Sequence, residues 1–139
     1  MIEGLSHITF IARDLDRMSA ILTGVFDAQE VYSSDAEGFS LSQEKFFLIG
    51  GVWVAVMQGE ALPSRSYNHV AFKIDEADFD RSLDRVKALG LDVRPPRPRA
   101  EGEGRSIYFY DDDNHMFELH TGTLAERLAR YAKGKEAAQ

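Results

Sequence analysis

The stretch Tyr67-Asn68-His69-Val70-Ala71-Phe72 decides the expected fold, because it repeats an earlier stretch, Leu5-Ser6-His7-Ile8-Thr9-Phe10. In both stretches a histidine is followed by three residues that favour strands, and a charged, helix-like segment comes next. A histidine-bearing strand that occurs twice indicates the duplication of one ancestral module. The two histidines are therefore candidates for converging on a common point.

The elements that follow these strands repeat in the same order. In the first copy the sequence predicts a strand at 5–12, a helix capped by Asp14, and strands at 30–33, 39–49 and 52–58. In the second copy it predicts a strand at 68–74, a helix from Asp75 to Gly90, and strands at 91–93, 106–110 and 116–120. Thr123 should cap a terminal helix, and the polar tail beyond Tyr131 should fray.

Strands outnumber helices, so the predicted fold class is α+β rather than doubly wound α/β. Two halves that each contain a strand, a helix and three strands can form one curved mixed sheet. We expect one domain over residues 1–139, made of a module at 4–59, a module at 67–122 and a C-terminal helix at about 123–132.

Composition excludes several classes of protein. The chain has 139 residues, of which 44% are hydrophobic and 28% charged, as in an ordinary soluble globular domain. No stretch approaches the roughly 18 consecutive apolar residues of a membrane span, and no secretion signal is evident, so we expect a cytoplasmic protein. The absence of cysteine excludes disulfides and thiolate ligands, and a formal charge of −7 argues against nucleic acid. The exception is a basic loop at 94–105, which is either a solvated linker or a lid.

Three side chains are candidate metal ligands: His7, His69 and Glu118. One histidine in a half-buried strand is more often structural, but two at equivalent positions of a repeat favour ligation. An ionised glutamate among apolar neighbours is costly unless it is paired or bound to metal. The position equivalent to Glu118 in the first copy is Ala55, which cannot ligate. Two imidazoles and one carboxylate suit a divalent first-row metal with open coordination positions, and spacing alone does not choose among Mn, Fe, Zn and Ni.

The paired modules with these three residues resemble the vicinal oxygen chelate superfamily over about residues 4–131. Within it, the chain is similar to the fosfomycin-resistance proteins. The similarity lies in His7-Ile-Thr-Phe, Trp53, Tyr67-Asn-His69-Val-Ala-Phe, Ser106-Ile-Tyr108-Phe and Glu118-Leu-His-Thr-Gly-Thr-Leu-Ala-Glu-Arg127. The last run is the most specific of these, with Arg127 nine residues after Glu118.

This resemblance implies paired βαβββ modules, Mn(II) at the metal site, and a homodimer whose sites draw ligands from both chains. It also implies a small-molecule substrate, the phosphonate epoxide fosfomycin. Thr9, Tyr67, Ser106, Tyr108 and Arg127 would hold the phosphonate, and Trp53 would shape the wall of the site. Strand alternation supports part of this set, since Thr9 shares a strand face with His7 and Tyr67 shares one with His69. The alternative for Arg127 is a solvated helix charge.

Glu44 indicates that water is the nucleophile that opens the epoxide. In Glu44-Lys-Phe-Phe-Leu-Ile-Gly-Gly, followed by Trp53, the chain looks like the hydrolytic, FosX-type branch, in which this glutamate is the general base. Epoxide hydration needs a base that deprotonates water. The alternative is a surface glutamate paired with Lys45 or solvent. We therefore predict a Mn(II)-dependent fosfomycin hydrolase that adds water at the phosphorus-bearing carbon and gives antibiotic resistance.

Three rival functions stay open at this point. Glutathione or another thiol could open the same ring, although the loop at 94–105 lacks the lysine found in the thiol-using branch. An extradiol dioxygenase shares the three-ligand pattern, and a non-catalytic drug-binding protein shares the fold. His115 and His120 have no role assigned from the sequence.

Overall fold

The computed structural model describes residues 1–34 and 43–138. The described residues form two compact units, one from positions 1–64 with 112–114 and the other from positions 65–111 with the remainder after 114. The expectation of a single domain with modules at 4–59 and 67–122 stays a prediction.

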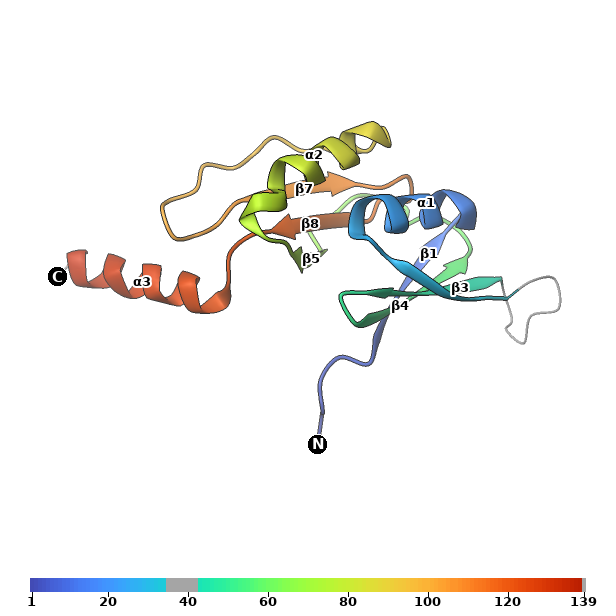
Figure 1. Cartoon of the computed structure of the whole chain (residues 1–139), viewed down its shortest axis with the longest axis horizontal. Coiled ribbons are helices and arrows are strands. Elements are labelled where there is room, and N and C mark those ends of the chain that lie inside the picture. The colour runs from blue at the N-terminus through green and yellow to red at the C-terminus, as the bar shows by residue number, and fades with distance from the viewer. Residues whose placement is uncertain (35–42, 139) are drawn as a thin grey trace. The chain divides into compact units, whose positions relative to one another are not determined.

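The first unit contains β1 (His7–Ala12), α1 (Leu15–Phe26), β2 (Gln29–Ser33), β3 (Glu44–Ile49) and β4 (Val52–Gln58). Among its described residues the sheet has the order β1-β4-β3-β2, in which β1 and β4 are parallel and the other pairs antiparallel. Helix α1 begins where the Asp14 carboxylate accepts the backbone N–H of Arg17 at 3.0 Å. Figure 1 shows α1 beside the sheet of this unit, and packing against β3 and β4 buries its apolar residues, which are Met18, Ile21, Leu22, Val25 and Phe26.

Strand alternation gives this sheet two different faces. Phe10, Phe47 and Val54 are buried on the side of α1. The opposite face carries the more exposed residues of β1, among them His7 and Thr9. This second face holds the polar side chains that matter for the site.

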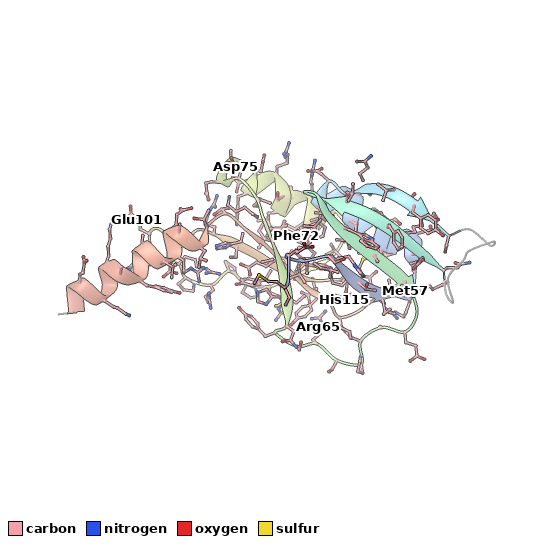
Figure 2. All side chains as sticks on the ribbon, turned by 90° about the horizontal axis from the view of Figure 1, so that it is seen from below. Met57, Arg65, Phe72, Asp75, Glu101 and His115 are labelled. Atoms are coloured by element: carbon pink, nitrogen blue, oxygen red, sulfur yellow. The ribbon has the colours of Figure 1, made fainter. Side chains whose placement is uncertain are left out.

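The second unit contains β5 (His69–Lys73), a short 3₁₀ turn η1 (Glu76–Asp78), α2 (Phe79–Ala88), β6 (Asp92–Val93), β7 (Ser106–Tyr110), β8 (Met116–His120) and α3 (Leu124–Ala138). Its described sheet has the order β5-β8-β7-β6, again with a parallel first pair. Asp75, labelled in Figure 2 where the chain leaves β5, caps η1 by accepting the N–H of Ala77 at 2.9 Å. The α+β class and the repeated βαβββ order expected from the sequence are confirmed.

The strand registers make the two halves equivalent residue by residue. On the parallel pair β1–β4, Thr9 lies opposite Ala55. On the parallel pair β5–β8, Ala71 lies opposite Glu118. Thr9 and Ala71 each follow a histidine by two residues, so Ala55 and Glu118 occupy the same place in their modules, as the sequence alignment of the halves predicted.

The C-terminal helix differs from the prediction in length and packing. Thr123 caps it through a reciprocal pair of bonds with Glu126, at 3.2 Å to the backbone N–H and 2.9 Å to the carboxylate. The helix then continues to Ala138 instead of fraying after Tyr131, because its Ala, Lys and Glu residues are strong helix formers. Leu124 and Leu128 are exposed by 73% and 56%, so neither is covered within the described residues. Figure 1 shows α3 beyond the end of β8, and Figure 2 shows Glu101 beside it.

The described chain also bears on one predicted strand and on membrane-spanning helices. The predicted strand at 39–49 is observed from Glu44 to Ile49, and its residues 39–42 lie outside the described residues. Among the described helices, none is long and apolar enough to cross a membrane.

Candidate metal and substrate site

Two of the three predicted metal ligands face each other in the second unit. His69 comes from β5 and Glu118 from β8, and the Nε2 atom of His69 lies 3.0 Å from Oε1 of Glu118. The Glu118 side chain is only 8% exposed and that of His69 22%. A buried carboxylate and an imidazole are thus aimed at one point.

The tautomer of His69 shows why this pair fits a cation. Nδ1 lies 2.7 Å from the backbone carbonyl of Tyr67, which can only accept, so Nδ1 carries a hydrogen. In the neutral ring the Nε2 lone pair then faces a carboxylate oxygen of Glu118, and the two would repel each other. The contact is stable only when a proton or a metal ion stands between them. The donor set of one imidazole and one carboxylate therefore suits a divalent first-row metal, and the Tyr67 carbonyl already fixes the orientation of the imidazole ring.

Glu118 also belongs to a polar network on the same sheet face. Its Oε2 accepts the Ser106 hydroxyl at 2.6 Å, and Ser106 Oγ lies 2.8 Å from Nδ1 of His120. One guanidinium nitrogen of Arg99 donates to Ser106 Oγ and to the Tyr108 hydroxyl, both at 3.0 Å. Tyr67 reaches the Tyr108 hydroxyl at 3.4 Å. The structure thus brings His69, Glu118, Tyr67, Ser106 and Tyr108 together.

Burial sets the protonation of two members of this network. Burial raises the pKa of the Tyr108 hydroxyl, and the bond with Tyr67 and the charge of Glu118 raise it further. Burial lowers the pKa of His120, a shift that the Glu118 charge opposes. Tyr108 is therefore a hydroxyl at neutral pH, available as a donor to an anion.

In the first unit, His7, Thr9, Trp53 and Glu44 lie on the face opposite α1. The register places His7 opposite Trp53, and their rings stack with centroids 4.1 Å apart. Glu44 lies opposite Met57, which lies opposite Ile11. Along the strands Glu44 is thus displaced from His7 by four residues, about 13 Å, with the Thr9 position halfway between.

Glu44 is held by its backbone rather than by its side chain. Its N–H donates to the Ser34 hydroxyl at 2.8 Å, and its carbonyl accepts the Ser34 N–H at 2.9 Å. Among the described residues its carboxylate has no hydrogen bond or ion pair, whereas Lys45 on the opposite face pairs with Glu30 at 3.1 Å. Glu44 borders a polar cavity of about 630 Å³ in this unit.

Arg127 stands in the first turns of α3 with an unsatisfied group. Its Nε is buried and has no hydrogen-bond partner among the described residues, while one terminal nitrogen donates to Tyr131 at 3.4 Å. That bond raises the pKa of Arg127, and the charge of Glu118 acts in the same direction. A buried guanidinium N–H without a partner is consistent with an anionic ligand.

No group of three His, Asp or Glu side chains that could hold a metal occurs among residues 1–34 and 43–138. His69 and Glu118 supply two donors, and the third predicted ligand, His7, belongs to the other unit. Sequence reasoning missed Arg99 and His120 as parts of the network. The signals for them were weak: Arg99 lies in a loop expected to be a linker, and His120 merely shares a strand face with Glu118.

Comparison with known proteins gives consistent findings. The family model described as the Glyoxalase/Bleomycin resistance protein/Dioxygenase superfamily matches residues 4–119. The chain is 79% identical to the fosfomycin resistance protein FosX of Mesorhizobium japonicum over 139 residues, covering 100% of both chains. It is 37% identical to the metallothiol transferase FosB of Shouchella clausii over 138 residues, covering 96% of this chain and 90% of that one.

A solved structure is also similar to this chain. It is a crystal structure of a mutant FosX from Listeria monocytogenes complexed with Mn(II) and 1S,2S-dihydroxypropylphosphonic acid. The TM-score is 0.86 at 54% identity, and the match covers 94% of this chain and 99% of that one.

Proposed function

The chain belongs to the Glyoxalase/Bleomycin resistance protein/Dioxygenase superfamily and, within it, to the FosX fosfomycin resistance proteins, and on this premise we propose that it is a Mn(II)-dependent fosfomycin hydrolase. It adds water to the oxirane at the phosphorus-bearing carbon and thereby inactivates the antibiotic. The observation that carries the proposal is 79% identity to FosX over the whole length. The Listeria complex with a dihydroxypropylphosphonate supports it, because that diol is the compound formed when water opens an epoxypropylphosphonate.

The metal site is proposed to consist of His7, His69 and Glu118. The 3.0 Å contact between Nε2 of His69 and Oε1 of Glu118 supports the choice, because a metal ion is one of the two species, with a proton, that can make this contact favourable. His7 supplies the third donor, and in the proposed homodimer it comes from the other chain. When bound, the Mn(II) ion acts as a Lewis acid that stabilises the negative charge developing on the oxirane oxygen.

Glu44 is proposed as the general base that takes a proton from the attacking water. Opening of an oxirane requires water to approach carbon on the side opposite the C–O bond that breaks. The base must therefore stand apart from the group that receives the oxygen. The four-residue displacement of Glu44 from His7 on one sheet face fits this requirement. Its half-buried side chain, whose carboxylate has no partner among the described residues, supports the same role.

The phosphonate is proposed to bind through Thr9, Tyr67, Tyr108 and Arg127. Tyr108 keeps its proton because burial raises its pKa, so it can donate to a phosphonate oxygen. Arg127 has a buried N–H without a partner among the described residues, and its charge complements the anion. Trp53, stacked on His7 and 37% exposed, lines the wall. Ser106, predicted from the sequence as another phosphonate contact, donates its hydroxyl hydrogen to Glu118 in this structure.

One experiment separates hydrolysis from its rivals. The protein is incubated with Mn(II) and excess fosfomycin, with and without glutathione, and the products are separated by mass. We expect the diol in amounts far above the protein concentration, with or without the thiol. A glutathione adduct as the main product would assign the FosB-like reaction, which the 37% identity keeps as the second candidate. Loss of drug only in proportion to protein would show a binding protein.

Two remaining expectations stay predictions. A homodimer should give a mass near twice 15.6 kDa in light scattering. A cytoplasmic location should leave the protein in the cytosolic fraction of lysed cells.

A further inference from the structure

Three side chains contact Ser106 Oγ, and one of them is the proposed metal ligand Glu118. It lies 2.6 Å from Oε2 of Glu118, 2.8 Å from Nδ1 of His120 and 3.0 Å from a guanidinium nitrogen of Arg99. A serine hydroxyl has one hydrogen to donate and two lone pairs with which to accept. Three partners therefore use its full capacity.

The partners fix the direction of each bond. The Arg99 guanidinium can only donate, so Ser106 accepts from it. The Glu118 carboxylate can only accept, so the single hydrogen of Ser106 points to Oε2. That hydrogen is then no longer available to His120, and Nδ1 of His120 must carry its own hydrogen and donate to Ser106.

The other tautomer of His120 is incompatible with this geometry. It would direct the Nδ1 lone pair at Ser106 Oγ and also at Oε2 of Glu118, 3.3 Å away. With hydrogen on Nδ1, both contacts are attractive. This assignment rests on positions and holds whether the second ring nitrogen is protonated or not.

From this bond count we infer that His120 is a positioning residue: it orients the Ser106 hydroxyl, which holds Oε2 of Glu118 so that Oε1 is presented to the metal beside His69. The inference rests on the proposed function, since it assigns Glu118 as a metal ligand. It also removes Ser106 from the phosphonate contacts, because a hydroxyl whose only hydrogen is bonded to Glu118 has none for an anion.

The backbone around His120 supports a built-in orientation. Ser106 and His120 are direct register partners on β7 and β8, so their side chains emerge side by side on one face. The His120 side chain is only 18% exposed. A Cβ atom at Gly122 would lie 2.8 Å from Nε2 of His120, so the glycine leaves the room that this ring orientation needs.

A matched pair of substitutions at position 120 isolates the N–H donor. His120→Asn keeps an N–H group close to the place of Nδ1, whereas His120→Leu keeps a similar bulk and removes the donor. Loss of a bond to a metal ligand lowers metal affinity by about 10–100-fold. We expect His120→Leu to raise the Mn(II) dissociation constant by that factor and His120→Asn to stay within about threefold of wild type. The measurement is titration of free Mn(II) by electron paramagnetic resonance, without substrate.

A double-mutant cycle tests whether His120 acts through Ser106. Ser106→Ala alone should weaken Mn(II) binding, and adding His120→Leu to it should produce little further loss. A purely structural role would instead give additive losses that parallel a lower melting temperature of the metal-free protein. If His120→Leu does not fold, His120→Asn and Ser106→Ala decide the question together: the inference then requires Mn(II) affinity near wild type in the first variant and weakened affinity in the second.

The outcomes separate this inference from the proposed function. Wild-type protein that fails to bind Mn(II) would overturn the proposed function and, with it, the inference. Wild-type protein that binds Mn(II), together with unchanged affinity in His120→Leu or Ser106→Ala, overturns the inference only. Equal losses in the Asn and Leu variants overturn it as well, because the N–H donor would then be irrelevant.

Discussion

Replacement of Glu44 by glutamine should stop catalysis while leaving the fold intact. The bonds that hold residue 44 are made by its backbone to Ser34, and the substitution keeps both of them. The carboxylate has no partner among the described residues, so no ion pair is lost. We therefore expect the free energy of unfolding to change by no more than about 0.5 kcal/mol.

The size of the kinetic effect follows from the role of a general base. Glutamine has the shape of glutamate but cannot take up the proton of water. Positioned general bases contribute about 10²–10⁴-fold in rate. At about 1.36 kcal/mol for each tenfold change, the barrier to diol formation should rise by roughly 3–5.5 kcal/mol.

The assay is diol formation from fosfomycin with saturating Mn(II), followed by mass or by phosphorus NMR. Glu30→Gln is the matched control, because it makes the same chemical change on β2, at an exposed residue whose partner is Lys45. The control should turn over like wild type. Diol formation by Glu44→Gln at the wild-type rate would refute the assignment, and a parallel loss of Mn(II) affinity would show that Glu44 acts on the metal site instead.

The other predictions concern stability, pH and the metal. Gly104→Ala should cost more than about 2 kcal/mol in urea denaturation, because φ is +75° and the new Cβ would lie 2.5 Å from the backbone N of Gly122. Gly134→Ala, in the interior of α3, should instead stabilise by about 0.5–1 kcal/mol, because its Cβ would make only an ordinary contact, 3.7 Å from a terminal nitrogen of Arg130; equal effects would contradict the packing. Hydrogen bonding from Arg105 holds the pKa of Glu76 below its usual 4.5, so this pair stabilises the fold above that pH and ceases to do so as the pH falls through the depressed pKa. Arg105→Gln should accordingly lower the melting temperature at pH 7 by more than at pH 3, and an undiminished gap at pH 3 would assign the effect to packing of Arg105 on the Phe79 ring. Chelation with EDTA should abolish diol formation and lower the melting temperature, and added Mn(II) should restore both; activity that survives chelation contradicts a metal-dependent reaction.

Much of the fold could be predicted because its signals are local. Strand alternation around His7 and His69 and the cap at Asp14 each depend on a few neighbouring residues, and the structure has them as expected. Comparison of the two halves also predicted that Ala55 and Glu118 occupy equivalent positions in their modules. The strand registers confirm this equivalence. The extent of α3 was misjudged, because the polarity of the tail was given more weight than its helix propensity.

The candidate site was predicted in its residue types more than in its contacts. The sequence by itself determined a duplicated module with two equivalent histidines and one buried glutamate. The hydrophobic period of the strands and the repeat of the histidine stretch can both be observed in the order of the residues. Only the tertiary structure decided what surrounds Glu118. Arg99 belongs to a proline-rich loop and His120 to β8, and each occupies one hydrogen-bonding position of the Ser106 hydroxyl. Such bonds depend on the approach of side chains from separate elements to within 3 Å, and no local pattern encodes that approach.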